Sequence, residues 1–337
     1  MKSTAVVILN WNGRKHLEQF LPSVVEHTPQ QVRIVVADNG STDDSVEFVA
    51  QHYPRIEIVA LDKNYGFAEG YNRALEDIDT ELFILLNSDV EVTAGWVEPL
   101  VAMLSNNSNV AAVAPKLLAY SKRQNFEYAG AAGGYIDLLG YPFCRGRILS
   151  TIEQDKGQYD SAREVFWASG AAFCCRADIF RMMGGFCGDF FAHMEEIDLC
   201  WRMQLAGYKI MVEPRSCVYH LGGGTMPNES PRKLYLNYRN NLSMLYRCAP
   251  TWQRLLVAVV RPLTDMLSAV IYLLKGEMPL VKATLKAYGD FIKMHKKLSS
   301  ERKIIRSSAK KESSQIYRNS IVVRYMMGRR TFGDIKL

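Results

Sequence analysis

Three segments of this chain place carboxylate or carboxamide side chains directly after an apolar run. Asn10 and Asn12 follow residues 4–9, Asp38, Asn39 and Asp43 follow residues 32–37, and Asn87 and Asp89 follow residues 82–86. Each group alone is typical of the turn that ends a strand. Three such groups at one edge of a sheet favour a ligand site, because open α/β sheets bind ligands beyond the carboxyl ends of their strands.

The chemistry available to these groups is metal and nucleotide binding. The chain contains neither a GxGxxG nor a GxxxxGK[ST] motif, which argues against a nicotinamide cofactor and a P-loop. A bound diphosphate would then need a divalent cation, Mg²⁺ or Mn²⁺, and Asp89 is its candidate ligand. His220, which precedes three glycines, is either a second metal ligand or a structural histidine. Asp38 can accept a hydrogen bond from N3–H of uracil or thymine.

Glu195, Glu196 and Asp198 bring three carboxylates to the start of an expected helix at 195–206. Acidic side chains stabilise a helix N-terminus, and Asp198 can pair with Arg202 one turn later. This structural interpretation explains Asp198 well. It explains less well why two adjacent glutamates follow an aromatic pair. Glu195 and Glu196 are therefore candidates for acid–base chemistry. Because successive helical side chains diverge by about 100°, only one of them can face a cleft squarely.

Apolar segments alternate with amphipathic stretches in the first 114 residues, which predicts β-α-β units and a parallel sheet. Strands are expected at 4–9, 32–37, 56–61, 82–86 and 110–114, as a pair within 165–175, and at 209–212 and 217–219. The run at 82–86 contains no polar residue. It should therefore lie at the centre of the sheet, buried on both faces.

The composition of the chain changes near residue 225. Residues 1–225 hold 19 Lys and Arg against 28 Asp and Glu, whereas residues 226–337 hold 22 against 7. We expect an α/β domain at 1–225 and a basic, amphipathic helical region at 226–337. The glycine-rich residues 116–160 lack the strand–helix alternation and should form an irregular insertion.

The stretch at 255–274 is rich in Leu, Val and Ile, but Arg261, Pro262 and Asp265 interrupt it, which predicts broken apolar helices. Its longest uncharged piece, 266–274, is far shorter than the roughly 20 residues of a spanning helix. Two interpretations stay open. The region lies in an anionic membrane interface with its lysines at the headgroups, or it is a helical subdomain packed on the sheet.

Cysteine usage and the start of the chain indicate the compartment. The seven cysteines are odd in number and include no CxxC pair, which favours reduced thiols over disulfides or a zinc site. The apolar run after Met1 and Lys2 is too short for a signal peptide. We expect a cytoplasmic protein, with the inner face of the plasma membrane as a candidate peripheral location and no nucleic-acid partner.

Six motifs occur in order and at plausible spacing: VVILNWNG, VVADNGSTDDS, NYGFAEGYN, LLNSDV, GGFCGDFFAHMEEIDLCWR and YHLGGGT. Over about residues 4–248 the chain resembles family 2 glycosyltransferases, nearest to bacterial rhamnosyltransferase-like members. The resemblance implies the GT-A fold, a Rossmann-like, mostly parallel sheet flanked by helices, here with a C-terminal helical region. It also implies inverting transfer of a sugar, with rhamnose as a candidate, from a UDP- or dTDP-sugar to a hydroxyl of a lipid-linked bacterial surface glycan.

The resemblance assigns roles to individual residues. Asp38 matches the nucleobase-binding aspartate, Asp89 the metal-binding aspartate, and His220 a later metal-ligand histidine. Glu196 matches the second acid of an acidic pair, the base that deprotonates the acceptor, and Glu195 precedes it. The other residues expected to contact the nucleotide are Asn10, Asn12, Asn64 and Asn87.

Two positions depart from the family pattern. Asn87 stands where many members carry the first Asp of a DxD motif, and Glu196 stands where Asp is usual. These departures support one alternative, a degenerate transferase that binds glycan or scaffolds an assembly. The other alternative, a sugar-nucleotide nucleotidyltransferase, would need a glycine-rich basic loop after the first strand, where this chain has Asn10, Trp11 and Asn12.

Overall fold

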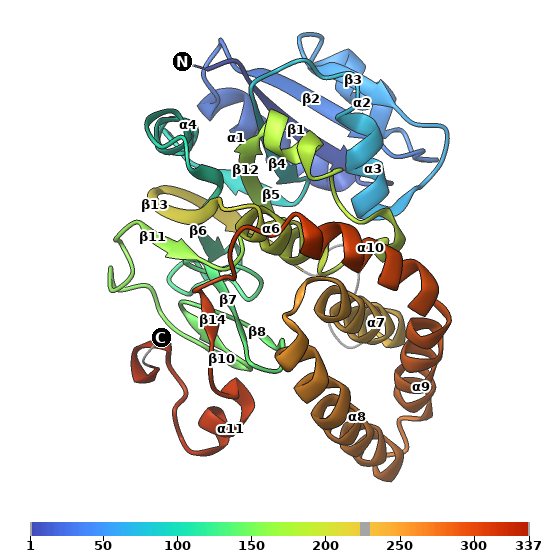
Figure 1. The fold of residues 1–337 in the computed structure, drawn as a ribbon. Coiled ribbons are helices and arrows are strands. Elements are labelled where there is room, and N and C mark those ends of the chain that lie inside the picture. Colours follow the sequence, from blue (N-terminus) through green and yellow to red (C-terminus); the bar gives the residue numbers. More distant parts are fainter. Residues whose placement is uncertain (1, 223–229, 336–337) are drawn as a thin grey trace.

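The structure, a computed structural model, describes residues 2–222 and 230–335. A large mixed sheet occupies the upper part of Figure 1, and a small second sheet lies below it beside a group of C-terminal helices. The strands of the large sheet are β1 (Thr4–Asn10), β2 (Arg33–Asp38), β3 (Glu57–Ala60), β4 (Leu82–Asn87), β5 (Val90–Val92), β6 (Val110–Ala119), β11 (Arg163–Val165), β12 (Ala172–Arg176) and β13 (Lys209–His220). Those of the second sheet are β7 (Gly134–Asp137), β8 (Pro142–Cys144), β9 (Arg147–Ile148), β10 (Thr151–Ile152) and β14 (Ile316–Tyr317).

Helices cover both faces of the large sheet and form most of the C-terminal region (Figure 1). The α-helices are α1 (Arg14–His27), α2 (Ser45–His52), α3 (Gly66–Ala74), α4 (Val97–Asn106), α5 (Ala177–Met182), α6 (Glu195–Leu205), α7 (Pro231–Cys248), α8 (Thr251–Leu274), α9 (Met278–Lys293), α10 (His295–Ser307) and α11 (Ile321–Met326). Two short 3₁₀ helices are η1 (Gly188–Phe190) and η2 (Phe332–Asp334).

The large sheet has a parallel core. Its strand order is β11-β13-β6-β12-β4-β1-β2-β3, with β5 paired to β13. The strands β4, β1, β2 and β3 are mutually parallel, and β12 lies antiparallel between β4 and β6. The predicted α/β class is confirmed. The expected strand pair within 165–175 is wrong, because β11 pairs with β13 and β12 with its own neighbours.

The central strand is β4, as its apolar sequence predicted. Leu82, Phe83, Ile84, Leu85 and Leu86 are fully buried. Side chains that alternate along β4 enter separate apolar clusters on the two faces of the sheet. Each such side chain contributes about 1.5–3 kcal/mol by leaving water, so a polar residue is tolerated only where the strand ends.

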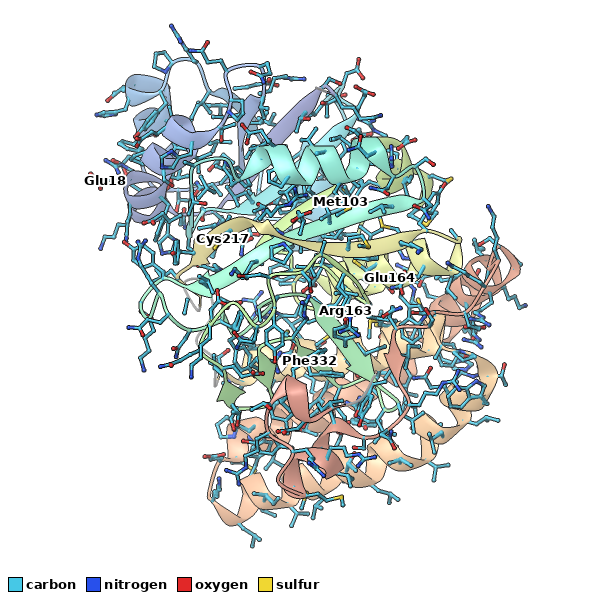
Figure 2. All side chains as sticks on the ribbon, turned by 90° about the vertical axis from the view of Figure 1, so that its left-hand side faces the viewer. Glu18, Met103, Arg163, Glu164, Cys217 and Phe332 are labelled. Atoms are coloured by element: carbon cyan, nitrogen blue, oxygen red, sulfur yellow. The ribbon has the colours of Figure 1, made fainter. Side chains whose placement is uncertain are left out.

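The insertion at 116–160 is more ordered than its glycine content suggested, because it builds the second sheet with help from the chain's end. β14 pairs with β7, aligning Ile316 with Ile136. Phe332 packs on Tyr135 and Tyr159, with ring centroids 5.4 and 5.7 Å apart. Figure 2 shows Phe332 in the lower half of the molecule, below the strand that carries Cys217. The later region therefore packs on the earlier one.

Helix α8 runs unbroken from Thr251 to Leu274, so the expected interruption at Arg261 and Pro262 is wrong. Arg261 is buried, donates to Asn241 Oδ1 at 2.6 Å, and pairs with Asp265 at 3.1 Å. The two charges satisfy each other inside the protein and allow the helix to continue. By length and composition alone, α8 is long and apolar enough to cross a membrane, a test that core helices of soluble proteins also pass.

Removing Asp265 should destabilise the protein strongly. Asp265→Ala leaves the buried Arg261 guanidinium without its counter-charge, which typically costs about 3–5 kcal/mol. Urea unfolding measures the difference. The matched control is Glu57→Ala, which removes an exposed pair with Arg33 at 2.7 Å and should cost less than about 1 kcal/mol. Equal losses for the two variants would contradict the importance of the buried pair.

Candidate active site

The register of the sheet brings the predicted polar residues to one edge. Asn10 on β1 lies opposite Asp38 on β2, and Asn87 on β4 lies opposite Leu9 on β1. Beyond β4 the chain forms β5, whose Val90 pairs with His220 at the end of β13. This pairing carries Asp89 next to His220. The structure therefore gathers side chains that are up to 210 residues apart in the sequence.

On the nucleotide side of the site, Asp38 is buried and held from two directions. Asn10 Nδ2 donates to its Oδ1 at 3.0 Å, and the Ser41 backbone N–H donates to its Oδ2 at 2.9 Å. Within the described part of the chain each carboxylate oxygen accepts one of these hydrogen bonds, which leaves it a lone pair for a ligand. A fixed carboxylate with spare acceptor capacity suits an N–H group of a base.

Asn12 and Asn64 use their side-chain oxygens to hold loops around the site. Asn12 Oδ1 accepts from the Thr42 N–H at 2.7 Å, and Asn64 Oδ1 accepts from the Gly66 N–H at 2.8 Å. Asn39, which the sequence places at the same strand end as Asp38, connects two loops. It donates to the Gly66 carbonyl at 2.9 Å and accepts from the Tyr65 N–H at 3.0 Å.

Asp89 and His220 fit the expected divalent cation. Asp89 Oδ1 lies 3.2 Å from His220 Nε2, and both residues are buried. Two ligand atoms that lie about 2.1 Å from an octahedral cation and form a right angle at it are ~3.0 Å apart. The Asp89–His220 distance is close to this separation. Among the described residues, no three His, Cys, Asp or Glu side chains form a ready ligand set. Asp89 and His220 would therefore hold the ion together with a substrate diphosphate.

Glu127 is a buried carboxylate at this position that sequence analysis missed. Its Oε1 lies 3.3 Å from His220 Nδ1, and its Oε2 accepts from the Ala129 N–H at 2.5 Å. Such a carboxylate behind a histidine fixes which ring nitrogen faces a metal. No signal in the sequence could have found Glu127, because it lies in the irregular segment between β6 and β7.

The charges of this cluster are strongly coupled. Burial opposes the charge of His220, but hydrogen bonding to Asp89 and Glu127 outweighs it and raises the pKa of His220 to about 10. Burial also opposes ionisation of Asp89, and His220 outweighs it, so the pKa of Asp89 is lowered. Without a cation, His220 thus supplies the positive charge beside Asp89.

The two adjacent glutamates begin helix α6, as the sequence predicted. Glu195 is buried and Glu196 is half-buried, and each has an Oε2 without a hydrogen-bond partner among the described residues. A Cβ added to Gly170 would lie 3.8 Å from Cδ of Glu196. The next residue, Ala171, accepts from the Asn87 N–H at 3.0 Å. Glu196 therefore lies close to the edge that carries Asn87.

Burial governs the titration of both glutamates. It raises the pKa of Glu196 to about 7 and, together with the charge of Glu196, raises the pKa of Glu195 well above its usual value. A base with a pKa near 7 takes a proton efficiently at neutral pH. Asp198 has the structural role expected of it, because Arg202 Nε donates to its Oδ2 at 2.7 Å inside the core.

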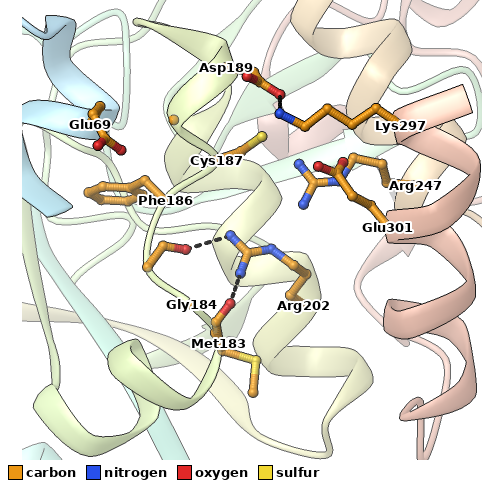
Figure 3. Close-up of a pocket in the computed structure, with 12 residues that line it drawn as sticks. Glu69, Met183, Gly184, Phe186, Cys187, Asp189, Arg202, Arg247, Lys297 and Glu301 are labelled. Carbon is orange, nitrogen blue, oxygen red and sulfur yellow. Dashed lines mark hydrogen bonds and ion pairs between the residues drawn. The ribbon is translucent and has the colours of Figure 1, made fainter. Parts of the chain in front are cut away.

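A polar cavity of about 550 Å³ lies between the segment 183–189 and helix α10 (Figure 3). No predicted site residue lines it. Its cations are already paired: Arg202 donates to the carbonyls of Met183 and Gly185, Lys297 contacts Asp189, and Arg247 lies 3.2 Å from Glu301. The cavity is therefore separate from the sheet-edge site.

Known proteins resemble this chain in sequence. Residues 5–165 match the model of the family Glycosyl transferase family 2. An N-acetylglucosaminyl-diphospho-decaprenol L-rhamnosyltransferase of Mycobacterium tuberculosis is 28% identical over 232 residues, covering 64% of this chain and 75% of that protein. A pre-mycofactocin glycosyltransferase of the same organism is 29% identical over 226 residues, covering 65% of this chain and 43% of that protein.

Solved structures resemble it in fold. TarS 1-349 of S. aureus in complex with UDP-GlcNAc has a TM-score of 0.58 at 15% identity, covering 97% of this chain and 92% of that one. The mannosyltransferase PcManGT of Pyrobaculum calidifontis in complex with GDP-Man and Mn²⁺ has a TM-score of 0.54 at 14% identity, covering 91% and 86%. At these identities the likeness shows the fold alone. The expected GT-A fold with a C-terminal helical region is confirmed.

Asp89→Ala should weaken the binding of UDP in the presence of Mn²⁺. If Asp89 binds the ion directly, its loss should lower the affinity at least by the roughly tenfold that is typical of the groups that support a metal ligand. Isothermal titration with and without Mn²⁺ measures the effect, and circular dichroism checks the fold. Asp44→Ala, at the exposed start of α2, is the control. Unchanged UDP affinity in Asp89→Ala would move the metal site elsewhere.

The rate of sugar transfer should rise with pH through about pH 7. The folded-state pKa of Glu196 is raised, so if Glu196 acts as the base, its carboxylate form is lost as the pH falls below that value. Initial rates between pH 5 and 9 measure the profile. In Glu196→Gln this acid limb should disappear from the residual rate. A wild-type rate already constant from pH 5 would contradict the assignment.

Proposed function

From the match of residues 5–165 to the model of glycosyl transferase family 2, we propose that the protein is an inverting, metal-dependent glycosyltransferase. It would move a sugar, with rhamnose as the candidate, from a UDP- or dTDP-sugar to a hydroxyl of a lipid-linked bacterial surface glycan. The observation that carries this proposal is the convergence of two chemistries at one sheet edge. Asp38, Asp89 and His220 offer a donor site, and Glu196 offers a base beside it.

Inversion needs a single displacement at the anomeric carbon. Glu196 takes the proton of the acceptor hydroxyl while the hydroxyl oxygen forms the new glycosidic bond. The bond from the sugar to the diphosphate breaks on the opposite side, and the nucleoside diphosphate leaves with the electron pair. A bound cation, held by Asp89 and His220, would neutralise that leaving group. One base and one stabilised leaving group suffice, with no covalent intermediate.

Support for the substrates comes from the relatives. The name of the M. tuberculosis rhamnosyltransferase states a diphospho-decaprenol acceptor, which is lipid-linked. The TarS complex holds a uridine nucleotide sugar, and PcManGT holds Mn²⁺. Asp38 is held as an acceptor that suits uracil or thymine. A lipid-linked acceptor would require the protein to work at the cytoplasmic membrane surface.

The outer face of helix α8 supports that location. Its exposed large apolar side chains recur every three or four residues from Trp252 to Val270, namely Trp252, Leu255, Val259, Leu263, Leu267 and Val270, and Ile271, Leu273 and Leu274 follow. The opposite face carries Gln253, Val257, Arg261, Asp265 and Ala269, all buried. A spanning helix would expose the Arg261–Asp265 pair to lipid, so we propose that α8 lies along the interface.

Charge around this face suits anionic headgroups. Lys275 and Lys282 are exposed next to the C-terminal end of α8, and residues 226–337 carry 22 basic against 7 acidic residues. Other lysines of the region are engaged within the protein, since Lys286 and Lys293 pair with Asp290. Apolar contact and electrostatic attraction would therefore act together.

Glu196→Gln should lower kcat by about 10²–10⁴-fold with donor affinity little changed, because it keeps the shape and removes the basicity. Glu195→Gln is the matched control and should lower kcat by a smaller factor. Steady-state transfer assays with a panel of UDP- and dTDP-sugars measure both. An inactive Glu195→Gln beside an active Glu196→Gln would reverse the assignment. A wild type without transfer or donor hydrolysis would favour the scaffold alternative.

Leu263→Ser with Leu267→Ser should abolish binding to vesicles of phosphatidylcholine and phosphatidylglycerol. The two side chains are 69% and 60% exposed, so their loss should leave the thermal midpoint unchanged. Flotation at low and high salt measures binding, which salt should weaken. Met182→Ser, 58% exposed on α5, is the control. We prefer point variants to a truncation of the C-terminal helices, because α9 packs on α7 and α8 and its removal would disturb the fold. Undiminished flotation of the double variant would exclude this face.

A further inference from the structure

The segment that precedes the two glutamates has an unusual backbone. Phe191, His193 and Met194 have φ angles of 63°, 71° and 73°, and none of them is glycine. Left-handed backbone is unfavourable for residues with a Cβ, so such a segment persists only where its surroundings determine it. Met194 is the N-cap of α6. The direction of Glu195 and Glu196 therefore depends on what holds residues 190–194.

One side chain of helix α7 holds most of this segment. Asn240 Nδ2 lies 2.9 Å from the carbonyl oxygen of Phe190, 2.9 Å from that of Ala192 and 2.8 Å from that of His193. Asn240 is fully buried. Its two N–H groups thus serve three backbone acceptors, one of which, the Phe190 carbonyl, also accepts from Arg239 Nη2 at 3.2 Å. Without Asn240 these carbonyls would lose their shared donor.

The orientation of the Asn240 amide is itself determined. Arg239 Nε and Nη2 donate to Asn240 Oδ1 at 2.9 and 2.7 Å, which leaves Nδ2 to face the carbonyls. On the other side of the segment, the Phe191 carbonyl accepts from the N–H groups of Phe67 and Ala68 at the start of α3. The segment is held between α3 and α7.

We propose that Asn240 is a positioning residue that aims Glu196, and with it the general base, at the acceptor hydroxyl. As regards the base, the inference rests on the proposed function. Asn240 would act only through the backbone of residues 190–194, and it contacts neither Asp38 nor Asp89. Loosening the segment should therefore lower the rate of the chemical step and leave the donor site intact.

Asn240→Ala tests this inference by separating kcat from donor binding. A misplacement of about 1 Å can cost roughly 10²-fold in rate, so kcat should fall by about that factor. The dissociation constant of UDP with Mn²⁺ should stay within about twofold, a split that a general loss of stability would not produce. Asn240→Ser keeps one hydroxyl donor, so its kcat should lie between those of Asn240→Ala and wild type. This variant replaces Asn240→Ala in the test if Asn240→Ala does not fold.

The matched control is Gln253→Ala. Gln253 is also a fully buried amide, and it donates to the Leu138 carbonyl at 3.0 Å, away from the glutamates. The variant Gln253→Ala should lower the thermal midpoint of the protein without changing kcat. A second readout needs no substrate: amide hydrogen exchange of residues 190–196 should accelerate in Asn240→Ala and not in Gln253→Ala.

The outcomes distinguish the inference from the proposed function. A wild type that transfers no sugar overturns the proposed function, and the exchange measurement then still decides whether Asn240 holds the segment. An active wild type with kcat equal in Asn240→Ala and Gln253→Ala overturns the inference alone. Unchanged exchange at residues 190–196 in Asn240→Ala overturns it as well.

Discussion

Burial of β4 on both faces is the constraint on which the rest of the structure depends. Because its five apolar side chains fill the core on both sides, polar residues are confined to the strand's end. The parallel register with β1 and β2 then places the ends of three strands side by side. The backbone register brings Asn10, Asp38 and Asn87 together, and Asn10 then donates a hydrogen bond to Asp38. The site is a consequence of the packing of the sheet.

The two halves of the site keep their carboxylates in different states by different means. On the donor side, Asp89 is held ionised by His220 despite burial. On the base side, burial without a counter-charge raises the pKa of Glu196. Pairs of groups whose environments push their pKa values apart can divide acid, base and binding roles within one site. Here the proposed cation ligand and the proposed base differ in whether an imidazole lies beside the carboxylate.

The C-terminal region supports the site with one helix, α7, and exposes an apolar face on another helix, α8. Asn240 of helix α7 donates to the segment before the glutamates. The next residue of α7, Asn241, accepts a hydrogen bond from Arg261 of α8. The buried stripe of α8 thus belongs to the fold, while its exposed stripe is large, continuous and apolar. An apolar face of this kind on an otherwise paired helix indicates an interaction surface.

The sequence by itself determined the parallel strands β1 to β4, the class of the fold, the polar residues at the strand ends and the start of α6 at Glu195. These features follow from local periodicity and from turn chemistry, which each stretch of chain carries independently. Only the tertiary structure decided the rest. Glu127 and Asn240 meet His220 and the segment 190–194 across long separations, and no periodicity marks a single buried Glu or Asn. Likewise, Arg261 and Pro262 predicted a broken helix, and α8 continues because Asp265 and Asn241 satisfy the buried guanidinium.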